Sequence, residues 1–229
     1  MSQKIVFLIF SGPTKEYIDP IRFISNESSG KMGKALAETA FKRGHDVVFI
    51  SGPVNKYPTN VRLIEVTTAL EMFKEVKLNL RKVNIVIGVA AVSDYRAAKI
   101  YKHKIKKNVA LQKIELKENP DIIKYCAKKK SKQVVCGFAL ETRAMLSNAK
   151  EKLRKKNLDM ILVNGKETFG SDRATFYLVR EGKVLKIKNK SKIHIAGIII
   201  DDLVRLYENT KTGRAKHKRV YGMGRRRGI

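Results

Sequence analysis

The feature that most constrains the fold is a strand-loop-helix-strand unit across residues 4–54. An apolar run, KIVFLIF, leads into a long loop that ends in SNESSGKMG, and a helical segment then precedes a second apolar run, DVVFISGPV. In parallel α/β sheets, ligands bind in the crevice beyond the carboxyl ends of the strands, where such a loop lies. We therefore expect the chemistry of the chain at this edge of a parallel sheet.

Apolar runs rich in β-branched residues recur along the chain and alternate with helical patterns. The predicted strands cover residues 4–10, 46–51, 61–66, 83–89, 133–138 and 159–163. This alternation is typical of an α/β fold with a doubly wound, mainly parallel, Rossmann-like sheet and helices on both faces. Two more runs, ATFYLV and KVLKIK, flank a turn at Glu181 and Gly182 and predict an added antiparallel hairpin.

Three helices are predicted from apolar residues at spacings of three and four. The first is entered through Ser28 and Ser29, either of which could be its N-cap, and Gly44 would end it. The second covers residues 142–156. The third covers residues 192–207, and its predicted buried stripe is Ile193, Ala196, Ile200, Leu203 and Tyr207.

The chain is strongly basic, with 49 lysines and arginines against 21 acidic residues and a net charge of +28. Such a field attracts nucleotides, phosphorylated metabolites, nucleic acids or anionic membranes. We expect one domain over residues 1–210 and a disordered tail over residues 211–229, where eight basic residues occur without an acid. The tail is either a tether to an anionic partner or a solvated end.

Cysteine and histidine spacing indicates the compartment. Cys126 and Cys136 lie ten residues apart without a C-x-x-C motif, so we expect reduced thiols, and the four histidines lack zinc-site spacing. The N-terminal apolar run is too short for a signal peptide, and no run approaches the roughly 18 apolar residues of a membrane span. The sequence predicts a cytoplasmic protein that does not associate with membranes.

Two segments near the predicted strand ends could bind an anion. In the first SGP turn, Gly12 would let the backbone approach a phosphate and Thr14 offers a hydroxyl, although SGPT lacks the spacing of dinucleotide folds and of P-loops and can equally be a plain turn. In the next loop, Arg22, Asn26 and the serines before the first helix could form an anion site at a helix N-terminus. They could also be a surface charge and a helix cap.

Lysines later in the chain could hold a polyphosphate. Small residues in GVAAVSD leave room for a ligand, and Asp94 lies ten residues before Lys104, which shares one side of an extended KIKK segment with Lys106. Lys152 and Lys156 lie one helical turn apart, and a bound polyphosphate would relieve their repulsion. Solvent and salt would relieve it too.

These motifs occur together in one known family. The chain contains, in order, SGPTKEYIDPIRFISNESSGKMG, SGPV, AAVSDYR, KIKK, NPDI, GFALET, EKLRKKNLD and FGSD. In this order and spacing it resembles the phosphopantothenate-cysteine ligase family of coenzyme A biosynthesis, over about residues 4–207. The resemblance implies that a nucleotide, CTP in most bacterial members, activates the carboxylate of 4'-phosphopantothenate as an acyl-cytidylate with loss of pyrophosphate, and that cysteine then displaces CMP to give 4'-phosphopantothenoylcysteine.

The resemblance also implies Mg²⁺ as cofactor, bound to phosphates with few protein ligands. It implies a homodimer, whose interface we expect at the hairpin of residues 174–188. Many bacterial members carry an N-terminal flavin-dependent decarboxylase. We expect this chain to be the ligase alone, with a separate phosphopantothenoylcysteine decarboxylase acting downstream.

Site residues are carried over by their positions in the motifs. The predicted catalytic residues are Asn26, which would handle the acyl intermediate, and Lys104, which would contact the triphosphate. The predicted nucleotide contacts are Gly12, Gly88, Val89, Ala90, Asp94, Lys104, Pro120, Asp121, Ile122, Ile123, Phe138, Lys152 and Lys156. The predicted substrate contacts are Arg22, Asn26 and Ala91, and no protein metal ligand is predicted.

The chain departs from the family pattern at two places and leaves two alternatives open. Asn164-Gly165 stands where members usually have Asn-Asp, and Arg173-Ala174 follows GSD where an Asn is usual, so the choice between CTP and ATP stays open. Tyr95-x-x-x-Lys99 has the spacing of a short-chain NADP-dependent oxidoreductase, although the glycine-rich cofactor turn is missing. The net charge also permits a basic nucleic-acid-binding protein, with non-specific, salt-sensitive binding.

Overall fold

The computed structural model describes residues 4–107, 113–165, 171 and 173–212. Its centre is an eight-stranded sheet in the order β12-β11-β10-β9-β6-β1-β4-β5. The parallel strands are β1 (Val6–Ser11), β4 (Asp46–Ser51), β5 (Arg62–Glu65), β6 (Ile85–Gly88), β9 (Val134–Leu140) and β10 (Met160–Asn164). The antiparallel hairpin of β11 (Arg173–Arg180) and β12 (Lys183–Ser191) extends one edge. The predicted strands, hairpin and fold class are confirmed.

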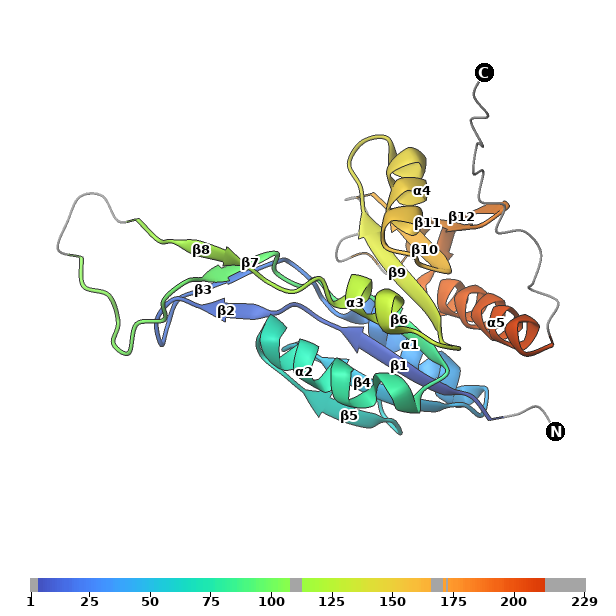
Figure 1. Ribbon diagram of the computed structural model, residues 1–229, viewed down its shortest axis with the longest axis horizontal. Coiled ribbons are helices and arrows are strands. Elements are labelled where there is room, and N and C mark those ends of the chain that lie inside the picture. Colours follow the sequence, from blue (N-terminus) through green and yellow to red (C-terminus); the bar gives the residue numbers. More distant parts are fainter. Residues whose placement is uncertain (1–3, 108–112, 166–170, 172, 213–229) are drawn as a thin grey trace, which may run out of the picture.

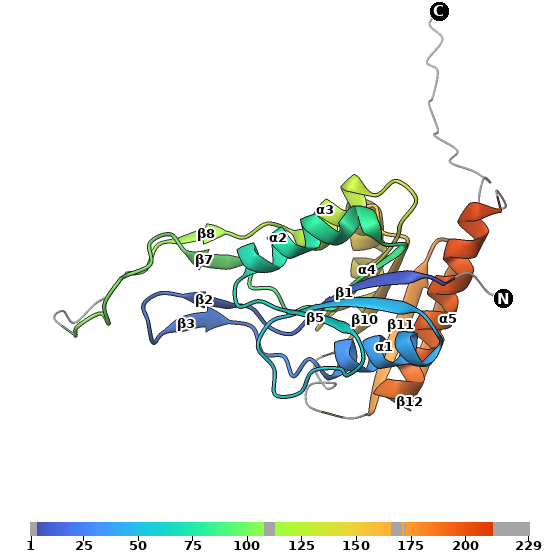
Figure 2. The same ribbon diagram turned by 90° about the horizontal axis from the view of Figure 1, so that it is seen from below.

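Helices cover both faces of the sheet, as Figures 1 and 2 show. One face carries α1 (Lys31–Lys42) and α5 (Lys192–Lys211). The other carries α2 (Ala69–Asn79), the short 3₁₀ helix η1 (Leu80–Lys82), α3 (Ile122–Lys129) and α4 (Met145–Lys155). No helix of the described residues is long and apolar enough to cross a membrane.

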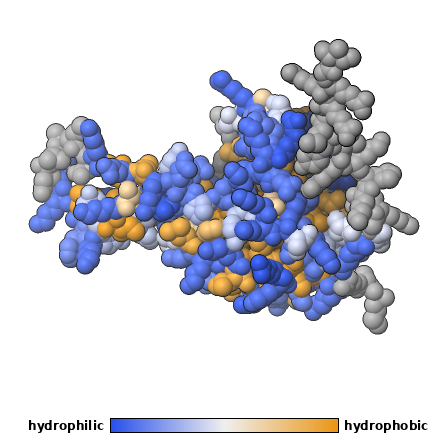
Figure 3. Space-filling model, in the orientation of Figure 1, coloured by the Kyte–Doolittle hydropathy of each residue, from blue (hydrophilic) through white to orange (hydrophobic). Residues whose placement is uncertain are grey.

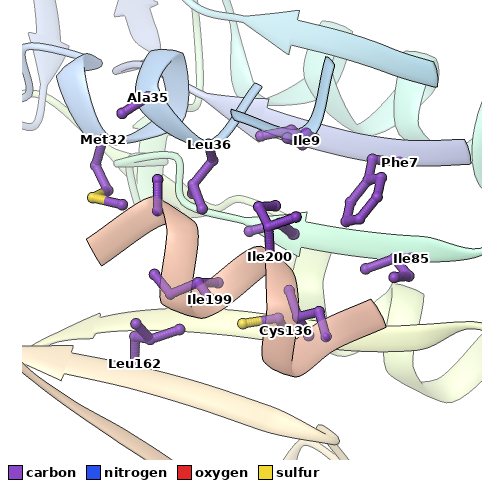
Figure 4. Close-up of a cluster of buried hydrophobic side chains, with 14 of the residues drawn as sticks. Phe7, Ile9, Met32, Ala35, Leu36, Ile85, Cys136, Leu162, Ile199 and Ile200 are labelled. Atoms are coloured by element: carbon purple, nitrogen blue, oxygen red, sulfur yellow. The ribbon is translucent and has the colours of Figure 1, made fainter. Parts of the chain in front are cut away.

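Each face of the sheet has its own apolar core, because successive side chains of a strand point to opposite faces. In β1, Phe7 and Ile9 join the core under α1 and α5, and Leu8 joins the other. Figure 4 shows the first of these cores, where Leu36 of α1 and Ile199 of α5 approach the strands. Burying each such side chain contributes roughly 1.5–3 kcal/mol.

Four short strands form an arm beyond the carboxyl ends of the parallel strands, at the left of Figures 1 and 2. They pair as β2 (Lys15–Tyr17) with β3 (Phe23–Ser25), and β7 (Tyr95–Ala97) with β8 (Leu116–Glu118). We call these strands, together with residues 18–22, 98–107 and 113–115, the arm. The sequence did not predict these strands. The rest of the described chain is called the body.

A buried carboxylate joins the two loops of the arm. Asp19 is fully buried and accepts from the backbone N–H groups of Ile21 at 2.9 Å and Arg22 at 2.8 Å. It also accepts from the N–H of Ile105 at 3.2 Å and from the Arg22 guanidinium at 3.1 Å. Burial opposes ionisation of Asp19, but these donors and the Arg22 charge outweigh it and lower the pKa of the carboxyl. Because Ile105 lies in the other loop, Asp19 holds both loops together.

At the start of two helices, α1 and α5, the structure differs from the predictions. Neither Ser28 nor Ser29 caps α1, whose N-cap is Gly30 at φ 67°, and the Ser28 hydroxyl instead accepts from the Gly30 N–H at 3.4 Å. Gly44 does follow the helix at φ 82°. Ile193 of α5 is 69% exposed, because periodicity gives the direction of a side chain but not whether another element lies opposite the first turn.

The two cysteines are free thiols, as predicted. Most of the predicted tail lies outside the described residues. Cys126 and Cys136 are both free and buried, and burial raises the pKa of the Cys126 thiol to about 12. Of the predicted tail, residues 211–229, only the first two residues are described, and of the FGSD motif only Ser171 is described.

Candidate active site

Two glycine turns lie back to back at the carboxyl ends of β1 and β4. The N–H of Gly52 donates to the carbonyl of Ser11 at 3.0 Å. A Cβ at Gly52 would lie 1.6 Å from the Pro13 carbonyl oxygen, and one at Gly12, where φ is 74°, would lie 2.9 Å from the Gly52 oxygen. The missing side chains therefore allow the turns to pack on each other, and Gly12 lines neither of the hollows described below. Its nucleotide contact stays a prediction.

A wide hollow of about 630 Å³ opens at the carboxyl ends of the central strands, beside the start of α1. We define it by its lining, residues 25–33, 89–92 and 138–140 with Ser11, Asp94, Asn164, Phe176 and Lys192. The first N–H groups of α1 have no partner within the helix and favour an anion, as do the positive charges of Lys31 and Lys192. This hollow suits a negatively charged ligand.

Asn26 is fixed in the wall of the wide hollow. Its Nδ2 donates to the carbonyl of Val92 at 2.9 Å, which ties the loop before α1 to the segment after β6. Ala91, a predicted substrate contact, lies in that segment and lines the same hollow, as does Val89. The structure therefore brings these predicted residues together.

A narrow hollow of about 240 Å³ adjoins the wide one. We define it by its lining, Phe10, Gly88, Ala90, residues 92–94, residues 119–123, Phe138 and Lys156. Ala90, Val92, Asp94 and Phe138 line both hollows, so the two are neighbours. Most of the predicted nucleotide contacts lie here, namely Gly88, Ala90, Asp94, Pro120, Asp121, Ile122, Ile123, Phe138 and Lys156.

Asn119 holds the two walls of the narrow hollow together. Its N–H donates to the Asp94 carbonyl at 2.8 Å, and its Nδ2 donates to the Ser93 carbonyl at 2.9 Å. Its Oδ1 accepts from Arg96 at 2.9 Å. Asn119 does not cap α3, because the helix begins later and Asp121 is its N-cap.

Thr14 supports this hollow from below and does not face a ligand. It is fully buried, and its Oγ1 accepts from the Ser93 N–H at 3.0 Å. Of the two interpretations of this segment, the structure favours the plain turn. The turn after β1 supports the segment after β6 instead.

Lys152 and Lys156 are not brought to one phosphate pocket. Lys156 Nζ lies 2.8 Å from Asp121 Oδ2 in the narrow hollow. Lys152 lines neither hollow, and its Nζ lies 2.5 Å from Glu141 Oε1. Partial burial opposes ionisation of Glu141, but Lys152 and Asn148 outweigh it and lower the pKa of the carboxyl. Each lysine thus has a carboxylate partner, and neither needs a polyphosphate.

Arg22 and Lys104 lie in the arm and line neither hollow. The Arg22 guanidinium contacts Asp19 and donates to the carbonyl of Ile105 at 3.3 Å. Lys104 precedes Ile105 in the same loop, and this loop is not a strand. Within the described chain these two residues are separate from Asn26, so their ligand contacts stay predictions.

The oxidoreductase alternative loses its geometric basis. Tyr95 lies in β7 of the arm, and Lys99 follows in the arm loop with its Nζ 5.2 Å from the centre of the Tyr101 ring. Neither residue lines the wide or the narrow hollow. Across the described residues, no group of three or more histidine, cysteine, aspartate or glutamate side chains is arranged to hold a metal ion.

Sequence reasoning missed several residues of the site. Lys192 reaches the wide hollow because the β11–β12 hairpin returns the chain to the start of α5, which no local motif indicates. Ser93 and Asn119 stand beside predicted residues in AAVSDYR and ENPDII, so their neighbours in sequence were the available signal.

The sequence of the chain matches a protein family and several curated proteins. Residues 2–207 match the model of the family described as DNA/pantothenate metabolism flavoprotein C-terminal domain. The chain is 42% identical over 207 residues to the Coenzyme A biosynthesis bifunctional protein CoaBC of Haemophilus influenzae, covering 88% of this chain and 52% of that protein. It is 40% identical over 212 residues to that of Escherichia coli, with coverages of 88% and 52%. The chain thus spans about half the length of the curated relatives it matches.

Solved structures agree with this placement. The C-terminal domain of a Coenzyme A biosynthesis bifunctional protein CoaBC has a TM-score of 0.79 and 36% identity, covering 90% of this chain and 97% of that chain. A mutant of Cab2 in complex with phosphopantothenate-cysteine has a TM-score of 0.75 at 18% identity, covering 92% of this chain and 88% of that chain. The second likeness shows the fold alone.

Proposed function

We propose that this chain, which belongs to the DNA/pantothenate metabolism flavoprotein C-terminal domain family, acts as a phosphopantothenate-cysteine ligase of coenzyme A biosynthesis. It would join 4'-phosphopantothenate to cysteine through an acyl-nucleotide, formed from CTP. The observation that carries this proposal is the pair of adjoining hollows at the carboxyl ends of the sheet, a narrow one that gathers most of the predicted nucleotide contacts and a wide one at the start of α1 that suits anions.

The division of the site suggests how each substrate binds. The nucleotide base would enter the narrow hollow, and its phosphates would lie in the wide hollow by the start of α1. The carboxylate of 4'-phosphopantothenate would meet the α-phosphate beside Asn26, whose bond to Val92 fixes the loop that carries it. Holding two anions in contact is the main task, because a mixed phosphoric anhydride then makes the carboxyl carbon a good electrophile.

Mg²⁺ fits this arrangement as a cation held mainly by the nucleotide. Glu27 and Asp94 are the acidic residues that line the wide hollow. They are too few for a cage, but they suit an ion that binds mostly to phosphate oxygens and water. Such an ion would neutralise the charge that develops on the departing pyrophosphate.

We further propose that the chain forms a homodimer through the arm. The arm exposes the apolar side chains Ile21, Phe23, Tyr95, Ile100, Ile114 and Leu116, and Figure 3 shows apolar surface there. The hairpin, where the sequence led us to expect the interface, exposes Val184 as its one large apolar side chain among the described residues. An interface at the arm would also bring Lys104 close to a second copy, which offers one way for it to reach a triphosphate.

The surrounding biochemistry follows from the same proposal. The product would be consumed by phosphopantothenoylcysteine decarboxylase, and the reaction would take place in the cytoplasm. Nucleic acid would bind only non-specifically, through the +28 charge.

The deciding assay mixes the protein with Mg²⁺, 4'-phosphopantothenate and either CTP or ATP, and follows pyrophosphate with and without cysteine. Pyrophosphate release that depends on phosphopantothenate is expected, and its absence with both nucleotides would reject the ligase. Asn26→Asp should slow product formation and let the acyl-nucleotide accumulate. Asn209→Asp, on the exposed end of α5, is the matched control and should behave as the unsubstituted protein.

A further inference from the structure

The narrow hollow contains a hydroxyl that the fold leaves without a partner. Ser93 lines this hollow and is 2% exposed, and its Oγ is buried with no hydrogen-bond partner. In the described residues the other such atoms are Ser11 Oγ and His45 Nδ1. A buried polar group without a partner is costly, so native proteins rarely keep one without a use.

The backbone of Ser93 is held from both sides. Its N–H donates to Thr14 Oγ1 at 3.0 Å, and its carbonyl accepts from Asn119 Nδ2 at 2.9 Å. Arg96 in turn donates to Asn119 Oδ1 at 2.9 Å and to the carbonyl of Glu118. These bonds fix the backbone of Ser93, so only its side chain can turn toward a partner.

Apart from the exposed carboxylate of Asp94, the other polar side chains of the narrow hollow are already engaged. Asp121 accepts from the Lys124 N–H at 3.0 Å and from Lys156 at 2.8 Å. The amide of Asn119 is used by Ser93 and Arg96. The Ser93 hydroxyl is thus the buried side-chain group there with its hydrogen-bonding capacity unspent.

The lining indicates which part of a nucleotide this hydroxyl would meet. This lining combines the apolar side chains of Phe10, Val92, Pro120, Ile122, Ile123 and Phe138 with polar groups that include Asp94 and Asn119. The one cation of the lining, Lys156, is paired with Asp121. Such a space suits a ring with apolar faces and hydrogen-bonding edges, whereas phosphates suit the wide hollow at the start of α1.

We infer that the Ser93 hydroxyl forms a hydrogen bond with the edge of the nucleobase and so contributes to nucleotide recognition. A hydroxyl both donates and accepts, so it can pair with a ring nitrogen, a carbonyl or an exocyclic amino group. The inference rests on the proposed function, since it requires that a nucleotide occupy the narrow hollow.

The test compares Ser93→Ala with Ser51→Ala by calorimetric titration of the full chain. The probes are CTP or ATP, whichever the unsubstituted protein turns over, and inorganic triphosphate, which lacks a base. Ser93→Ala should weaken nucleotide binding about 3- to 10-fold, the effect of one lost hydrogen bond, and leave triphosphate binding unchanged. Its stability to unfolding should stay level or rise, because an unpartnered hydroxyl has been removed.

Ser51 is the matched control because it is also buried at a strand end, but its Oγ donates to the Gly52 carbonyl at 2.8 Å and it lines neither hollow. Ser51→Ala should lower stability and leave nucleotide binding unchanged. Unaltered nucleotide affinity in Ser93→Ala, an equal loss for triphosphate, or a loss of stability alongside affinity would each overturn the inference. If the unsubstituted protein releases pyrophosphate and Ser93→Ala binds nucleotide with normal affinity, only this inference fails. If the unsubstituted protein neither binds nor turns over nucleotide, the proposed function fails as well.

Discussion

The body and the arm of this protein are held together by different forces. The body buries apolar side chains on both faces of an eight-stranded sheet, so its stability is spread over many residues. The arm buries Ile18 but exposes six large apolar side chains, and its two loops meet at the carboxylate of Asp19. One chain can thus contain a region stabilised by a large apolar core and another that depends on a single polar centre.

A truncation in the body should change the free energy of unfolding more than any other substitution considered. Leu36→Ala removes a fully buried side chain from the core under α1 and α5, and should lower the free energy of unfolding by about 2–5 kcal/mol. Ile21→Ala in the arm, at a side chain 60% exposed, should change it by less than about 0.5 kcal/mol. Urea denaturation of both variants measures the contrast. Similar losses in the two would mean that the arm has a core of its own.

Removing the charge of Asp19, the polar centre of the arm, should have the next largest effect, on the local stability of the arm. Asp19→Asn keeps the size of the side chain but removes the charge that several donors share, so the amides of Ile21, Arg22 and Ile105 should lose protection from hydrogen exchange. The midpoint of global unfolding should stay nearly constant. Asp46→Asn, at an exposed carboxylate paired with Lys4, is the control and should leave arm exchange unchanged. A fall in global stability with normal arm exchange would contradict the distinction.

Acid should loosen the arm through the same residue. The pKa of Asp19 is lowered in the folded protein, so its contribution is complete above the ordinary value of 3.8 and is lost as the pH falls through the folded pKa. The protection of the Ile105 amide, measured as its exchange rate relative to the intrinsic rate at each pH, should therefore fall as the solution is acidified below about pH 3.8, and Asp19→Asn should remove that dependence. A pH dependence that persists in Asp19→Asn would place its origin elsewhere.

The smallest effect on stability is expected from charges on the surface of the arm. Ile100→Lys should leave the unfolding of the isolated chain unchanged, because this side chain is already 66% exposed. It should weaken self-association in sedimentation velocity experiments, because a charge would be buried at the proposed interface. Val184→Lys on the hairpin is the comparison. If it weakens association and Ile100→Lys does not, the interface lies at the hairpin.

The sequence predicted the body well because its signals are long and repetitive. The strand β1 (Val6–Ser11) was predicted from a continuous apolar run, which is buried against both faces of the sheet, and the helices follow their apolar stripes. The arm had no such signal. Its strands have three residues each, too few for periodicity, and their loops are joined by Asp19, whose partners lie up to 86 residues away.

The site was predictable only in part. Asn26, Asp94 and Phe138 were found through motifs and do line the hollows. The partner of Lys152 was not foreseeable, because Glu141 lies before the helix and meets it only when the chain folds. The role of Thr14 stayed open because a sequence shows which groups can bind a ligand but not which the fold has already used.

The back-to-back turns at Gly12 and Gly52 also restrict how this scaffold can be redesigned. A side chain at Gly52 would overlap the backbone of Pro13, so neither turn can be rebuilt without its neighbour. Grafting a phosphate-binding loop from another nucleotide enzyme onto β1 would require replacing the turn after β4 in the same step. The two turns must therefore be redesigned together.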